Sequence, residues 1–137
     1  MYIAALLIAA IGSVVYHLSV KQVPADSNPF LALAISYGFA LIACIGGMVL
    51  FPAGNRSLAA LNWSSAGVAL GIVGIEVGFV LAYRSGWHVG QAALSTNVLS
   101  TLLLAPLGYW LFREQPSGSK LLGMSLSFAG LWLMMKK

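Results

Sequence analysis

Long apolar runs separated by short polar breaks dominate this sequence. Each run has roughly the 17 to 25 residues that an α-helix needs to cross a hydrocarbon core of about 30 Å. The runs cover residues 2–20, 30–51, 65–83, 91–112 and 121–135. The breaks between them collect proline, glycine, asparagine and most of the charged residues, as loops do. The pattern predicts an all-α integral membrane protein, with five transmembrane helices in a single domain over residues 1–137.

Composition favours a lipid bilayer over water as the surroundings of this chain. Hydrophobic residues make up 60% of the sequence and charged residues only 7%, which is too few to cover a soluble globule. A secretory signal peptide is an alternative for the first run, but no Lys or Arg precedes that run. A β-barrel is the architectural alternative, and the runs are too long and too continuously apolar for alternating strands.

The basic residues carry information about partners and orientation. The net charge of +4 rests on seven scattered residues, which form no basic stripe, so we predict no nucleic-acid partner. If the runs cross the membrane in turn, the two sides receive Lys21, Arg84, Lys136 and Lys137 against Arg56, Arg113 and Lys120. Because the division is nearly even, the positive-inside rule predicts no clear orientation. Either other features choose one orientation, or copies insert both ways round, which is dual topology.

One acid, Glu76, lies inside the third run, in the stretch GIVGIEVGFV. A carboxylate near the bilayer centre is costly unless it faces a cavity, finds a partner or is protonated. Gly74 and Gly78 lie about 160° away from it around a helix, on a face suited to close packing against another helix. We predict that Glu76 binds a cationic or amine substrate and exchanges a proton near neutral pH. The alternative is a protonated acid whose hydrogen bond ties helices together.

Other polar residues inside the runs are candidates for lining the same site. Tyr83 lies seven residues after Glu76 and shares its helix face. Tyr16 and His17 lie in the first run, where the imidazole either contacts substrate or protons or reaches toward the interface. Asn97 in the fourth run is either a ligand contact or an interhelical hydrogen-bond partner.

The usual signals of enzymes and metal sites are missing from the sequence. It contains no HExxH, G-x-S-x-G or Walker A motif, and it has only three acids and two histidines. The single cysteine, Cys44, excludes an internal disulfide and a cysteine-rich metal site. We therefore predict no enzymatic activity, no metal and no cofactor. Gly123 and Gly130 give the last run a small-residue face, which we expect to pack against a helix of the same or another protomer.

The second half of the sequence carries a recognisable set of features. They are Tyr83-Arg84 at the end of the third run, Gln91-Ala92-Ala93, Pro106, Glu114, Ser117, Gly123 and Gly130. With these features the chain resembles an EamA domain, the repeat unit of the drug/metabolite transporter superfamily, and the first half matches more loosely. Many relatives have an arginine where this chain has Ser36 and Tyr37, and relatives usually have a small or apolar residue in place of Glu76. The role of Glu76 is therefore not carried over from the family.

The resemblance implies a fold, a partner and an activity. Members typically hold two such domains in ten helices, related as inverted repeats around a substrate path. A single-domain, half-size form would need a partner inserted in the opposite sense, which predicts an antiparallel homodimer. The implied function is alternating-access transport of a small organic solute across a prokaryotic inner membrane. The solute would be an amine, an organic cation or an amino-acid-like metabolite, and transport would be proton-coupled if Glu76 exchanges a proton.

A second function remains open at this point. The same superfamily includes subunits of heteromeric flippases for lipid-linked sugars. If the chain belongs to such a complex, it is an accessory or flippase subunit without independent transport. A second, similar small protein would then copurify with it.

Overall fold

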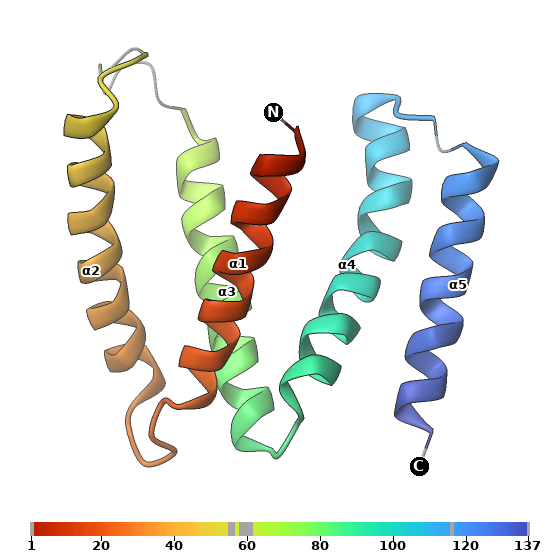
Figure 1. Cartoon of the computed structure of the whole chain (residues 1–137), viewed down its shortest axis with the longest axis horizontal. Coiled ribbons are helices and arrows are strands. Elements are labelled where there is room, and N and C mark those ends of the chain that lie inside the picture. The colour runs from red at the N-terminus through yellow and green to blue at the C-terminus, as the bar shows by residue number, and fades with distance from the viewer. Residues whose placement is uncertain (1, 55–56, 58–61, 116, 137) are drawn as a thin grey trace. The chain divides into compact units, whose positions relative to one another are not determined.

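A computed structural model describes residues 2–54, 57, 62–115 and 117–136. Five α-helices follow one another in these residues: α1 (Tyr2–Lys21), α2 (Pro29–Leu50), α3 (Ser64–Arg84), α4 (Val89–Phe112) and α5 (Gly118–Met135) (Figure 1). The described part contains no strand, so the prediction of an all-α chain is confirmed. Arg56 and Lys137, two of the basic residues used above, lie outside the described residues.

Capping residues set the helix starts slightly earlier than the apolar runs do. Asn28 caps α2, because its Oδ1 accepts hydrogen bonds from the backbone N–H groups of Phe30 at 2.9 Å and Leu31 at 3.3 Å. Pro29 occupies the first helical position, where a missing N–H costs nothing. Ser117 caps α5 by accepting from the N–H of Lys120 at 3.4 Å. Helix α5 therefore begins at Gly118, three residues before its apolar run.

The helices group into two compact units. One unit comprises Met1–Leu18 and Ser85–Lys137, and the other comprises Ser19–Arg84. In the first unit α4 and α5 pack side by side as an antiparallel pair, and in the second α2 and α3 do the same (Figure 1).

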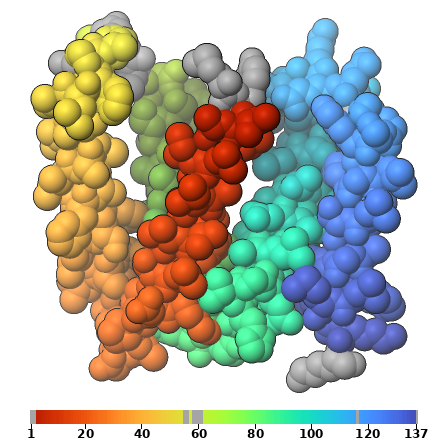
Figure 2. Space-filling model, viewed as in Figure 1, coloured from red at the N-terminus to blue at the C-terminus, as the bar shows by residue number. Residues whose placement is uncertain are grey.

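Four helices in the described residues are long and apolar enough to cross a membrane, namely α1 from Ile3, α2, α3 and α4. Helix α5 has 18 residues but begins with Gly118, Ser119 and Lys120, and it is not among these four. Most large apolar side chains are exposed, and the buried apolar set is short: Val20, Leu33, Phe79, Val80, Tyr83, Ala92, Val98 and Leu131. Figure 2 shows α5 in blue beside α4 in cyan. Trp132 and Leu133 on α5 are among the exposed apolar side chains. A bilayer covers such surfaces, so this is an integral, multi-pass membrane protein.

Candidate functional site

Glu76 lies deep inside α3, away from both ends of the helix. It follows Ser64 by 12 residues (76 − 64) and precedes Arg84 by 8 (84 − 76). At 1.5 Å per residue these separations are about 18 Å and about 12 Å. The other two acids of the chain, Asp26 and Glu114, lie outside the five helices. The Glu76 side chain is half-buried, so the protein shields it in part and leaves one side open.

Tyr37 on α2 is the polar residue that faces Glu76 in the same unit. Its hydroxyl interacts electrostatically with the Glu76 carboxyl. The two groups stop short of ordinary hydrogen-bond geometry, because the buried Tyr37 Oη has no hydrogen-bond partner among the described residues. In the sequence, Tyr37 stands out only as a departure from the family pattern. Counting residues from the α2–α3 loop would have identified Tyr37 as a neighbour of Glu76. Tyr37 lies 13 residues before the end of α2 at Leu50 (50 − 37), and Glu76 lies 12 residues after the start of α3 at Ser64, so the two residues lie at nearly the same depth.

The aromatic side chains beyond Glu76 pack against each other. Phe79 and Tyr83 are 7% and 6% exposed, and their rings stack with centroids 5.9 Å apart. Lys21 places its Nζ 5.3 Å from the Tyr83 ring centroid and donates a hydrogen bond of 3.5 Å to the Tyr83 carbonyl. Tyr83 is thus a buried part of the packing at the end of α3. Its predicted contact with substrate stays a prediction.

Arg84 fastens the α1–α2 loop to the end of α3. One of its terminal nitrogens donates to the carbonyls of Pro24 at 2.9 Å and Ser27 at 2.8 Å, and to the Ser27 hydroxyl at 3.2 Å. The loop that leads into α2 is therefore held by a guanidinium with several acceptors. This contact fixes one end of the helix pair that carries Tyr37 and Glu76.

Tyr16 and His17 lie near the end of α1, in the unit formed by Met1–Leu18 and Ser85–Lys137. The rings make an edge-to-face contact with centroids 5.0 Å apart, and His17 is 8% exposed. The His17 imidazole is therefore largely covered by protein, and its predicted contact with substrate or protons stays a prediction. Glu76 belongs to the other unit, so a joint role of these residues with Glu76 stays a prediction.

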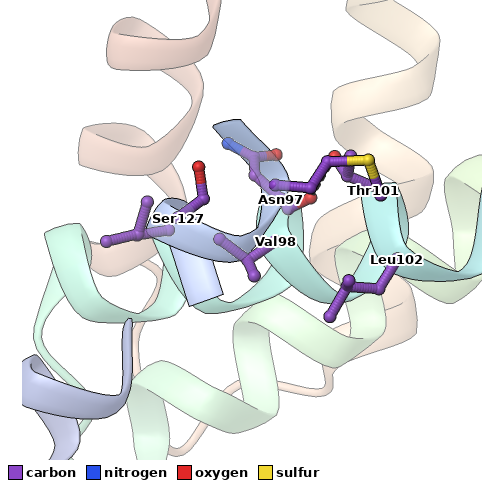
Figure 3. A pocket seen from close by; sticks show the side chains of 7 residues that line it. Asn97, Val98, Thr101, Leu102 and Ser127 are labelled. Atoms are coloured by element: carbon purple, nitrogen blue, oxygen red, sulfur yellow. Dashed lines mark hydrogen bonds between the residues drawn. The ribbon is translucent and has the colours of Figure 1, made fainter. Parts of the chain in front are cut away.

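Asn97 borders a cavity of about 190 Å³ between α4 and α5 (Figure 3). Seven residues line it: Leu94, Asn97, Val98, Thr101, Leu102, Met124 and Ser127. Pro106 has no N–H to donate to the carbonyl of Leu102, four residues earlier, which leaves that carbonyl without its usual intrahelical donor. The cavity is mostly apolar with a few polar groups at its wall, which is the general character of a small-molecule pocket.

Hydroxyl groups around this cavity are satisfied by their own helices. Thr101 donates to the carbonyl of Asn97 at 2.7 Å, and Ser127 donates to the carbonyl of Gly123 at 2.9 Å. Neither group therefore links one helix to the other. Ser95, which the sequence analysis did not single out, is 6% exposed, and its hydroxyl has no hydrogen-bond partner among the described residues.

The glycines predicted to mediate packing face open space in the single chain. A Cβ built at Gly74, Gly78, Gly123 or Gly130 would have no neighbouring atom within 4 Å. These faces are consequently not used for close contact between the helices described here. Their role in contact with a second protomer stays a prediction. No group of three or more acid, histidine or cysteine side chains that could hold a metal occurs among the described residues.

Comparison with known proteins identifies the family. The family model described as "EamA-like transporter family" matches residues 1–136, which is nearly the whole sequence. The chain belongs to the EamA-like transporter family. The EamA domain is the domain of the drug/metabolite transporter superfamily, so the expectation drawn from Tyr83-Arg84, Pro106 and the later glycines is confirmed. No curated protein and no solved structure matched the chain.

Membership in the EamA-like family establishes the broad activity. It is a family of membrane transporters rather than of enzymes, and it implies a small-molecule substrate and a lipid bilayer as the surroundings. The helices α1 to α4 supply membrane spans of the required length. Within this EamA-like chain, Glu76 with Tyr37 forms one candidate site, and the α4–α5 cavity with Asn97 forms the other.

Proposed function

We propose that this EamA-like protein transports a small organic cation or amine by alternating access, with Glu76 as the group that binds the substrate and the exchanged proton. The observation that supports this proposal is the position of Glu76, the one acid within the five helices and more than 10 Å, by about 1.5 Å per residue, from either end of α3. Ionisable residues inside membrane spans are rare and mark substrate or proton pathways.

The chemistry of the site follows from the cost of a charge in an apolar span. A carboxylate without a bound cation loses most of its hydration inside an apolar span, so it is stabilised either by a proton or by a cation. A carboxylic acid that meets an organic cation releases its proton to water and pairs with the cation. Since proton and cation compete for one group, a gradient of the cation can drive proton transport in the opposite direction. A proton gradient can likewise drive transport of the cation. Substrate affinity should therefore fall as the pH is lowered.

The remaining candidate residues would give the pathway its shape. We propose that Tyr83, Tyr16, His17 and Asn97 line the route of the substrate. The rings of the first three offer aromatic faces that suit a cationic or amine ligand. An amino-acid-like metabolite carries the same amine and belongs to the same proposed class. Glu76 would supply the charge, and the other four residues would supply contact area.

We further propose that two copies assemble antiparallel in a prokaryotic inner membrane, through faces that include Gly74, Gly78, Gly123 and Gly130. The sequence holds one EamA-like unit, and its near-even distribution of Lys and Arg is compatible with insertion in both senses. The test uses Cys44→Ala combined with Asp26→Cys, which places one thiol in an exposed loop. Dual topology predicts that an impermeant maleimide labels about half of this thiol from one membrane side. Complete labelling or none would show a single orientation and exclude this assembly.

The proposed activity is tested by transport in proteoliposomes. Uptake of benzyltriethylammonium, driven by an outward proton gradient, should occur with the wild type and with Asp26→Asn, whose acid lies in a loop. Glu76→Gln should reduce uptake to the level of empty vesicles. If Glu76→Gln transports as well as the wild type, Glu76 does not bind the substrate. If no variant transports this cation or any simple amine, the substrate class is wrong.

A further inference from the structure

We propose that Tyr37 is the positioning residue of the Glu76 site: its hydroxyl donates a hydrogen bond to the ionised Glu76 carboxylate, favours the charged form and orients it for a cation. This inference rests on the proposed function of Glu76 and deepens it. It assigns a second residue to the site, on a different helix from the acid.

Backbone geometry brings the two residues to one level of the α2–α3 pair. The helices run antiparallel and pack together, and each residue lies about 18 to 20 Å from the helix end that faces the shared loop. The Tyr37 hydroxyl is close enough to the Glu76 carboxyl for the two groups to interact electrostatically. Two polar groups at one depth, on touching helices, form a compact site.

The unused hydrogen-bonding capacity of Tyr37 supports the assignment. Its hydroxyl oxygen is buried, yet it makes no hydrogen bond among the described residues. A buried hydroxyl without a partner costs free energy, and a carboxylate is the strongest acceptor that α2 or α3 offers it. Ser36, the preceding residue, already donates to the carbonyl of Ala32 at 3.0 Å and does not compete. A small rotation of either side chain converts the present approach into a charge-assisted hydrogen bond.

The carboxylate can hold the hydroxyl and a cation at the same time. Its two oxygens offer about four acceptor positions, of which a phenol takes one. The hydroxyl therefore stabilises the form that binds cations without blocking the cation. Replacing Tyr37 by Phe keeps the ring and removes only this donor. A larger share of Glu76 then holds its proton at any given pH, and cations bind more weakly unless the pH is raised.

Few other groups on this helix pair can titrate. Helix α2 contributes Tyr37 and the exposed Cys44, and α3 contributes Glu76, Tyr83 and Arg84. Tyr83 is stacked on Phe79, and Arg84 is bonded to the α1–α2 loop. The ammonium of Lys21, at the end of α1, contacts Tyr83. A change of the Glu76 titration caused by Tyr37→Phe is thus assigned to the missing hydroxyl.

The test follows modification of Glu76 by dicyclohexylcarbodiimide, an apolar reagent that adds whole to a protonated carboxyl group and leaves a stable N-acylurea. Intact-mass spectrometry of the purified full-length chain gives the rate of modification as a function of pH. Glu76→Gln identifies the modified residue. Tyr109→Phe, which removes a hydroxyl from an exposed position on α4, is the matched control.

Tyr37→Phe should extend modification to higher pH than in the wild type and in Tyr109→Phe. Where most wild-type Glu76 is ionised, the rate should increase about ten- to a hundredfold, as expected for the loss of one hydrogen bond to a charged group. Superimposed pH profiles of Tyr37→Phe and wild type would overturn the inference. Protection of wild-type Glu76 by benzyltriethylammonium tests the proposed function separately, because it does not depend on Tyr37.

Discussion

The helix pairs α2–α3 and α4–α5 have the same antiparallel architecture, but the polar side chains of the two pairs have different interaction partners. Across α2–α3 an acid and a phenol from different helices approach each other, and a guanidinium holds the adjoining loop. Around the α4–α5 cavity the Thr101 and Ser127 hydroxyls bond to their own helices, and neither helix contains an acid or a histidine. The difference supports our proposal that α2–α3 carries the charge chemistry, whereas α4–α5 offers a mostly neutral, apolar surface.

The largest expected difference between the two pairs is in cation binding. Glu76→Gln should weaken benzyltriethylammonium binding at least about a hundredfold, because it removes the charge that pairs with the cation in an apolar span. Asn97→Leu should weaken it less than about tenfold, since the carboxamide is neutral and its side chain is exposed. Equilibrium binding in detergent measures both variants. A greater loss with Asn97→Leu would assign the binding chemistry to α4–α5 instead.

The next effect concerns the loop that Arg84 holds. Arg84→Ala should lower the free energy of unfolding by about 1 to 3 kcal/mol, since a guanidinium with three acceptors is lost. The matched control is Arg113→Ala, in the α4–α5 turn, which removes the same charge from a left-handed backbone position with φ of 54°. Thermal unfolding in detergent, together with proteolysis of residues 22–28, reports the change. Equal destabilisation by the two variants would show that Arg84 acts only through its charge.

A smaller contrast is expected between the caps of α2 and α5. Asn28→Ala should cost about 1 kcal/mol, because the Asn28 side chain accepts from two backbone N–H groups. Ser117→Ala should cost less, since its single capping contact is 3.4 Å long. The shift of the unfolding midpoint compares the two directly. The reverse order would mean that the start of α5 is more firmly capped than the start of α2.

The smallest effect is predicted for Ser95 on α4. Its buried hydroxyl has no partner among the described residues, so Ser95→Ala removes a polar group that contributes no hydrogen bond. Stability should stay within about 0.5 kcal/mol of the wild type or increase. A clear loss of stability or of cation binding would instead reveal a polar partner for Ser95 in the assembled protein.

Most of the secondary structure could be predicted from the sequence, because apolar runs of membrane length leave few alternatives. The helix starts could not be read from hydropathy alone, since Asn28 and Ser117 cap helices before the apolar residues begin. The prediction of five spans was confirmed only in part. The described residues form five helices, but α5 has a lysine in its first turn and falls short of the apolarity of the other four.

The candidate site was harder to predict than the fold. Glu76 stands out in the sequence because a charge in an apolar run is costly. Tyr37 does not stand out, since a tyrosine in a membrane helix is ordinary. Only the contact between α2 and α3, which brings Tyr37 near Glu76, suggests a role for it in the site. Asn97 was a candidate from its residue type, but its position beside a cavity depends on Met124 and Ser127 of a later helix.

The measurement that tests this account most directly is proton release on cation binding. Benzyltriethylammonium carries no titratable proton, so any proton that appears in a weakly buffered detergent solution comes from the protein. We predict release of up to one proton per bound cation from the wild type and none from Glu76→Gln. Binding of the cation to the wild type without proton release, or equal release from both proteins, would contradict the assignment of Glu76 as the shared site of proton and substrate.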